Sequence, residues 1–217
     1  MPNKRTYRQH CGVARALDVL GERWTLLIVR DLLLGPRRYG DLLESLDGIT
    51  TNLLAKRLRE MVRSGVVEKR RSPPPASGEL YALTPEGRAL EPVVMELGRW
   101  GGRLMDRPRA GDRVDLGLAL LALKRRYRGG LTLNVGLRAG ERAFHLRFSP
   151  DRMVVRDRPE EHADLELEAR EEVLRALFTG GAAAASLRAR GRLRVTGAER
   201  AFAELLASLD LGAGAAS

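Results

Sequence analysis

The sequence predicts an α+β fold in two domains, and three observations support this prediction. Its 217 residues suffice for one large domain or for two small domains that each bury a core, and 44% of them are hydrophobic. Helical periodicity dominates the first half, whereas the second half mixes alternating strands with helices. Residues 106–113 between the halves are rich in Arg, Asp, Pro and Gly, a composition typical of a linker.

The N-terminal half begins with a basic arm, residues 1–9, followed by three segments that we expect to be helical. Apolar residues recur at helical spacing over residues 11–20, 22–34 and 39–46. Each segment stops at or just before a glycine, a residue that commonly follows a helix end. The sequence therefore predicts three short helices in succession.

Residues 50–63 predict a fourth helix with two chemically different faces. One face carries apolar residues that suit a core: Leu54, Leu58, Met61 and Val62. The other mixes short polar groups with long cations: Thr51, Asn52, Ala55, Lys56, Arg59 and Arg63. Small residues permit close approach to a DNA major groove, Asn pairs with adenine, and Arg or Lys reaches guanine or phosphate. This face suits DNA recognition, against the alternative of an ordinary solvated face.

A basic hairpin follows the fourth helix. Residues 66–71 and 79–84 predict two strands, and the Pro-rich residues 72–78 predict the turn between them. A recognition helix followed by such a hairpin is a winged helix-turn-helix. A further helix is expected from Thr84 to about residue 104, since Thr84 and Pro85 form a typical helix start, and Pro92, Gly98 and residues 101–102 are places where it could be interrupted.

Nine residues of this half are candidates for contact with double-stranded DNA. We expect phosphate contacts from Arg38, Thr50 and Thr51, which would fix the register of the protein on the duplex. We expect base contacts from Asn52, Lys56 and Arg59. Because the tip of the wing offers no cation, its contacts should come from the preceding strand, from Lys69, Arg70 and Arg71.

The second half predicts one sheet with helices packed on it. We expect strands over residues 131–137, 144–148, 153–155, 164–168 and 191–197. We expect helices over residues 115–127, 171–179 and 199–209. The basic residues 186–194 resemble a nucleic-acid patch, but the alternation of Leu193 and Val195 with arginines favours a solvent-facing strand side.

Composition limits the function classes. A net charge of +10 and a pI near 10.7 favour nucleic acid first and anionic membrane surfaces second. No apolar run approaches the roughly 20 residues that span a bilayer, so no membrane insertion is expected. The single cysteine, Cys11, excludes an internal disulfide and suits a reducing cytoplasm. No catalytic, cofactor or metal motif is found, so we expect neither an enzyme nor a cofactor.

The first half closely resembles the HxlR branch of the MarR-like winged-helix regulators. The matching motifs, in order, are Cys11, residues 21–28 (GERWTLLI), 35–39 (GPRRY), 49–53 (ITTNL), 57–58 (RL), 65–67 (GVV), 81–87 (YALTPEG) and 100–101 (WG). The resemblance implies a bacterial, DNA-binding homodimer. We expect its interface on the first helix and on the helix around residues 93–100. The Pro-rich wing tip departs from the family pattern.

The resemblance also raises a role for Cys11, because HxlR-like regulators include members that sense oxidants or electrophiles through an N-terminal cysteine. Arg15, one helical turn further on, and the basic arm would lower the pKa of the Cys11 thiol. A lone thiol needs an intermolecular or a low-molecular-weight partner. The alternative is a small buried residue at a helix start.

The second half is similar to the sterol-carrier-protein-2 fold, through residues 163–167 (ADLEL), 171–179 and 191–197 (GRLRVTG). That fold commonly encloses an apolar pocket, which implies a small hydrophobic ligand; the alternative is a packed core. Candidate lining residues are Leu133, Val135, Phe144, Leu146, Phe148, Leu174, Leu177 and Phe178. The expected divisions are a winged-helix domain (1–105), a linker (106–113), a ligand-binding domain (114–211) and a disordered tail (212–217).

The sequence thus predicts a cytoplasmic, homodimeric transcription regulator that binds a pseudo-palindromic operator and responds to a hydrophobic ligand or to a thiol switch. The competing hypothesis is a lipid- or hydrophobe-binding protein whose winged helix makes protein contacts. Replacing Asn52, Lys56 and Arg59 separates the two, because only the regulator would lose specific DNA binding.

Overall fold

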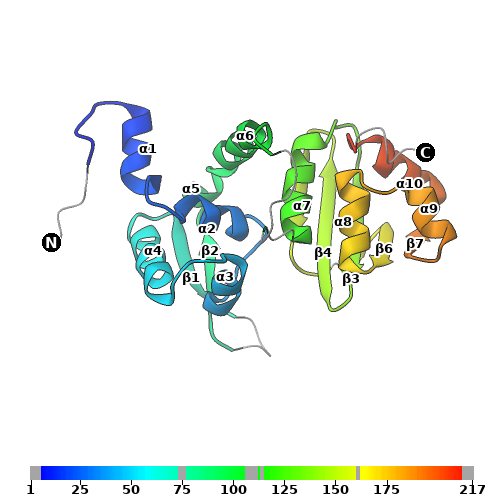
Figure 1. Ribbon diagram of the computed structural model, residues 1–217, viewed down its shortest axis with the longest axis horizontal. Coiled ribbons are helices and arrows are strands. Elements are labelled where there is room, and N and C mark those ends of the chain that lie inside the picture. The colour runs from blue at the N-terminus through cyan, green and yellow to red at the C-terminus, as the bar shows by residue number, and fades with distance from the viewer. Residues whose placement is uncertain (1–5, 73–76, 106–111, 113–114, 160–161, 212–217) are drawn as a thin grey trace. The chain divides into compact units, whose positions relative to one another are not determined.

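The chain forms two compact units, residues 1–97 and 98–217 (Figure 1). A computed structural model describes residues 6–72, 77–105, 112, 115–159 and 162–211. The predicted linker, apart from Asp112, and the predicted tail at 212–217 lie outside the described residues. The α+β class is confirmed, and the exact domain boundaries stay a prediction.

The first unit consists of short helices and a two-stranded wing. Its elements are α1 (Gly12–Leu20), α2 (Thr25–Leu32), α3 (Tyr39–Ser45), α4 (Thr51–Arg63), β1 (Val67–Arg71), β2 (Glu79–Leu83), α5 (Pro85–Arg88) and α6 (Glu91–Gly102), of which α6 extends past residue 97. The strands β1 and β2 pair antiparallel, as predicted. Gly87 on α5 sits so close to the wing that a Cβ there would lie 2.1 Å from the Val66 carbonyl oxygen. Only glycine permits this approach.

Two helices of this unit differ from their predicted bounds by more than one residue. Helix α2 ends at Leu32 rather than at residue 34, and it begins at Thr25 rather than at residue 22, because Trp24 adopts a left-handed backbone with φ of 80°. The helix predicted after the wing is two helices, α5 and α6, separated at residues 89–90. Pro92 lies in the first turn of α6. The N–H groups of a first turn have no partner within the helix, so the missing N–H of proline breaks no hydrogen bond, and Pro92 starts the helix instead of interrupting it.

The second unit is built on a mixed sheet. Its strands are β3 (Leu133–Ala139), β4 (Arg142–Ser149), β5 (Arg152–Arg156), β6 (Leu165–Ala169) and β7 (Leu193–Gly197). Within the described residues they lie in the order β5-β4-β3-β6-β7. The central pair β3 and β6 is parallel, and the other neighbours pair antiparallel. The carboxyl ends of β3 and β6 therefore lie at the same edge of the sheet.

Helices cover one face of this sheet, and the other face is polar. The helices are α7 (Leu116–Leu123), the 3-10 turn η1 (Lys124–Arg126), α8 (Glu171–Thr179), α9 (Ala184–Ala189) and α10 (Glu199–Ala207). Figure 1 shows α7 and α8 over the sheet, and the two helices contact each other. Along β3, Leu133, Val135 and Leu137 are buried whereas Arg138 is exposed. None of the helices within the described ranges is long and apolar enough to cross a membrane.

Candidate DNA-binding surface and thiol

The fourth helix, α4, has the two faces that the sequence predicts. Its N-cap is Thr50, whose hydroxyl accepts a hydrogen bond from the Leu53 N–H at 3.3 Å. Leu54 and Leu58 are fully buried, with 0% and 1% of their surfaces exposed. Asn52, Lys56 and Arg59 are exposed. The helix is thereby anchored on one side and leaves a polar side accessible.

The exposed face of α4 carries cations that are free of carboxylate partners. The side chains of Lys56, Arg59 and Arg63 make no hydrogen bond or ion pair with any residue in the part of the chain that the structure describes. Arg63 lies on the predicted polar face but is not among the nine predicted contacts. A cation without a protein partner can bind phosphate or guanine without first breaking an ion pair, so this face suits an anionic ligand.

Helix α3 supports the start of α4. The Tyr39 hydroxyl donates to the Thr51 carbonyl oxygen at 2.6 Å. The Arg38 N–H donates to the Asp41 carboxylate at 3.0 Å, and the Arg38 side chain is exposed. Its guanidinium lies 3.5 Å from where a Cβ on Gly78 would be, next to the wing. The structure thus places Arg38 between α3 and the wing, and its phosphate contact stays a prediction.

Two of the three predicted wing cations are already paired with carboxylates, which the sequence does not reveal. Lys69 donates to Glu79 at 2.8 Å, and this hydrogen bond, with the neighbouring Tyr81 and Glu79 charges, raises the pKa of Lys69. Arg70 is paired with Glu68. Of the three predicted wing cations, only the Arg71 side chain has no partner among the described residues. To contact DNA phosphate, Lys69 would have to leave Glu79 and Arg70 would have to leave Glu68. The tip of the wing, residues 73–76, lies outside the described residues.

A buried arginine joins α4 to the turn before α2. Arg57 is 6% exposed, and its guanidinium donates to Glu22 at 2.6 Å and to Glu60. Its Nε is buried without a hydrogen-bond partner. Residue types alone do not predict this network, but helical spacing gives a signal: Arg57 adjoins Leu58 and follows Leu54 by three residues, which places it on the apolar side of the helix. Arg57 fixes the orientation of α4 relative to the turn that contains Glu22.

Replacing Arg57 with Ala should lower the free energy of unfolding by about 2 to 4 kcal/mol, because a buried stem and charged hydrogen bonds are lost. The matched change Glu22→Gln should cost about 1 kcal/mol or less, since Glu22 is half exposed and Arg57 keeps Glu60. Urea denaturation followed by circular dichroism measures both. Equal effects of the two substitutions would contradict this role of Arg57.

Cys11 lies at the start of α1 with an exposed thiol. The nearby backbone N–H groups of Ala14 and Val13, at the start of α1, lower the pKa of the Cys11 thiol. Arg15, the predicted cause, instead pairs with Asp18 at 3.6 Å. Cys11 is also not buried, contrary to the alternative that the sequence leaves open. The thiol is accessible, and its lowered pKa makes it ionise more readily than a free cysteine.

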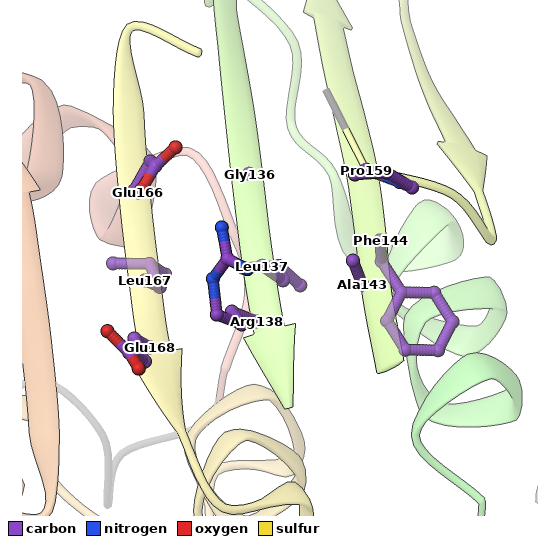
Figure 2. Close-up of a pocket in the computed structure, with 9 residues that line it drawn as sticks. All are labelled: Gly136, Leu137, Arg138, Ala143, Phe144, Pro159, Glu166, Leu167 and Glu168. Carbon is purple, nitrogen blue, oxygen red and sulfur yellow. The ribbon is translucent and has the colours of Figure 1, made fainter. Parts of the chain in front are cut away.

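The eight predicted ligand-lining residues form the core between the sheet and the helices. Leu133 is 8% exposed, and the other seven are at most 1% exposed. A cavity of about 20 Å³ adjoins this sheet, and of the eight only Phe144 lines it (Figure 2). That volume holds about one water, far less than a lipid. Figure 2 shows Arg138 on β3 beside Glu166 and Glu168 on β6, so this cavity lies mainly on the polar face.

Sequence comparisons identify both halves. Residues 19–109 match the model of the HxlR-like helix-turn-helix family. The HTH-type transcriptional regulator YodB of Bacillus subtilis is 33% identical over 99 residues, which cover 46% of this chain and 86% of YodB. The chain belongs to the HxlR-like helix-turn-helix family. Beyond this HxlR-like part, residues 122–209 match the SCP-2 sterol transfer family.

Other relatives extend the comparison of the HxlR-like half. An uncharacterized HTH-type transcriptional regulator of Mycobacterium tuberculosis is 40% identical over 97 residues; the match covers 45% of this chain and 61% of that relative. The chain thus spans less than two thirds of that relative's length. A solved structure of the redox regulator HypR in its oxidized form is 29% identical, covers 46% of this chain and 100% of HypR, and has a TM-score of 0.41. Because that score is below 0.5, the family assignment comes from the sequence matches alone.

Proposed function

We propose that this protein is a sequence-specific transcription regulator that binds double-stranded DNA as a homodimer. The observation that carries the proposal is the exposed face of α4, where Asn52, Lys56 and Arg59 lie together without carboxylate partners among the described residues. Two such helices, related by a two-fold axis, would occupy successive major grooves about 34 Å apart on a pseudo-palindrome. Such a regulator would work in the bacterial cytoplasm, where the operator lies.

The second copy of the chain would cover apolar side chains that one copy leaves in water. On α6, Val93, Leu97 and Trp100 follow one another at helical spacing and are 50%, 48% and 60% exposed. On α1, Val13 and Leu17 are one turn apart and also exposed. Fully burying one large apolar side chain stabilises an interface by about 1.5 to 3 kcal/mol, so a stripe of this length favours self-association.

In vitro selection from a random duplex library tests this proposal. We expect the full-length protein to enrich one pseudo-palindrome whose half-sites lie about one helical turn apart. Enrichment of a single half-site without symmetry would reject the dimeric arrangement. Absence of any consensus would reject sequence-specific recognition and favour the alternative in which the winged helix contacts protein.

The accessible Cys11 supports regulation through a thiol switch. In one such reaction, the Cys11 thiolate attacks a small disulfide, a mixed disulfide forms, and the released thiolate takes up a proton. The adduct would add bulk at the start of α1, beside the apolar residues Val13 and Leu17 proposed to form the dimer interface. Modification would thereby weaken the dimer and its DNA complex.

Cys11→Ser should remove the response of DNA binding to oxidised glutathione while leaving the affinity of the untreated protein unchanged. The alkylation rate of Cys11 by iodoacetamide should reach its half-maximum at a pH below that of a free cysteine, because the lowered pKa supplies thiolate at lower pH. The rate is measured by quenching the alkylation at successive times and quantifying the modified protein by mass spectrometry. A midpoint at or above that of free cysteine, or an unchanged glutathione response in Cys11→Ser, would contradict the thiol switch.

We further propose that the C-terminal unit, taken as residues 114–211, is the regulatory domain, joined to the DNA-binding domain (1–105) by the linker. The SCP-2 match supports a hydrophobic effector for this unit. Since Val135, Leu146 and Leu177 are completely buried, such an effector would have to separate the helices from the sheet. An effector that acts on transcription must bind the free and the DNA-bound protein with different affinities. Titration of a long-chain fatty acid into both forms checks this requirement.

A further inference from the structure

A basic concave surface lies at one edge of the C-terminal sheet, where the parallel strands β3 and β6 end and β7 begins. It is an open hollow of about 600 Å³, a volume that small molecules fill. Its lining residues are Gly140, Glu168, Ala169, Arg170, Gly191, Arg192 and Arg194. The hollow lies beyond the carboxyl ends of the parallel pair β3 and β6. The surface is separate from the predicted apolar pocket, with which it shares no residue.

This surface carries more positive than negative charge. Its guanidinium groups belong to Arg170, Arg192 and Arg194, and its lining contains one carboxylate, that of Glu168; Arg170 pairs with a second carboxylate, Glu172, at 3.1 Å. Glu168 is 3.6 Å from Arg194, its partner across the strands. The Arg192 guanidinium has no hydrogen-bond or ion-pair partner anywhere in the described part of the chain. At least one arginine is therefore available without breaking an existing side-chain contact.

Small residues in the lining leave space for a ligand between the arginine side chains. Gly140 and Gly191 both have a left-handed backbone, with φ of 65° and 63°, and a Cβ built on either would meet nothing within 4 Å. The third small residue, Ala169, ends β6, and Arg170 is the N-cap of α8. The positive end of the α8 dipole also lies here and is offset by Glu171 and Glu172 in the first turn of that helix. Gly140, Gly191 and Ala169 thus leave the backbone accessible at the base of the hollow, between the longer arginine side chains.

We propose that this surface binds a small ligand through a phosphate group. Planar guanidinium groups bond two phosphate oxygens at once, and several arginines around one hollow match the charge of a phosphate monoester. Arg192 would make the first contact, and Arg194 would turn from Glu168 to the phosphate. This site is independent of DNA recognition by α4 and provides the C-terminal unit with a ligand class different from the apolar one.

Titration of the full-length protein with inorganic phosphate, followed by ¹H–¹⁵N NMR, tests the site. We expect saturable shifts of the Gly140 and Gly191 amides, with binding about tenfold weaker or more in Arg192→Ala. The charge-matched control is Arg200→Ala, which removes an exposed arginine near the opposite end of β7. Equal weakening in both variants, or shifts that do not saturate, would overturn the proposal.

Glu168→Gln provides a test in the opposite direction. The substitution removes the carboxylate that competes for Arg194, so phosphate should bind several-fold more tightly than to the unsubstituted protein. Glu204→Gln changes the net charge equally but lies on α10 beside Arg200, and it should have little effect. Weaker or unchanged phosphate binding in Glu168→Gln would contradict the proposed competition.

Two further titrations distinguish the source of the phosphate. Glycerol 3-phosphate represents a small ligand, and duplex DNA and phosphatidylglycerol vesicles represent polymeric and lipid phosphate. We expect Arg192→Ala to weaken binding of glycerol 3-phosphate and to leave DNA and vesicle binding at the level of Arg200→Ala. If Arg192→Ala instead weakens only DNA or only vesicle binding, the surface contacts that partner and the small-ligand proposal is wrong.

Discussion

The combined substitution of Asn52, Lys56 and Arg59 by Ala should reduce affinity for the selected operator by about 10²-fold or more, because each bidentate base contact contributes about 1 to 3 kcal/mol. The three side chains are exposed and lie opposite the buried Leu54 and Leu58, so the free energy of unfolding should change little. Fluorescence anisotropy at fixed salt measures the affinity, and urea denaturation measures the stability.

The control for the α4 triple variant must remove the same two positive charges from a site away from α4. Arg126→Ala combined with Arg200→Ala removes two exposed cations from the C-terminal unit. Loss of specificity only in the α4 variant would establish base recognition by this face. A uniform loss of affinity for operator and scrambled duplex in both variants would show that α4 contributes charge alone, contrary to the proposed base contacts.

Leu97→Glu combined with Trp100→Glu should convert the dimer to a monomer, because the carboxylates would be placed within the apolar stripe of α6. A monomer loses the second half-site, so operator affinity should fall by about 10²- to 10⁴-fold. Sedimentation equilibrium measures the assembly state. Arg88→Glu on α5 introduces a carboxylate at another exposed site and should leave the dimer intact. Dimers of unchanged stability in the α6 variant would place the interface elsewhere.

Local patterns predict the elements that have strong periodicity or clear caps. The sequence predicts helix α8 over its observed residues, since it has an apolar face and is followed by Gly180 in the left-handed conformation. The N-cap Thr50 and the apolar spacing of α4 likewise locate the recognition helix. Helix α9 escapes prediction, because its Ala-rich sequence has too few large apolar residues to show a period.

Features that depend on tertiary contacts are beyond prediction from sequence. The pairing of Lys69 with Glu79 across the wing needs the strand register, which composition does not give. The pKa of Cys11 is lowered by backbone N–H groups rather than by a nearby cation, and such groups carry no sequence signature. Similarly, Arg170 and Arg192 lie 22 positions apart along the chain, and only the fold brings them to one surface.

Recognition of a particular DNA sequence by the exposed face of α4 is tested most directly by one titration. The full-length protein is titrated by fluorescence anisotropy against the selected pseudo-palindrome and against a scrambled duplex of the same composition, both at physiological salt. We predict an affinity about 10³-fold or more higher for the pseudo-palindrome. Equal, weak and salt-sensitive binding to both duplexes would contradict sequence recognition, because phosphate attraction alone would then explain the binding.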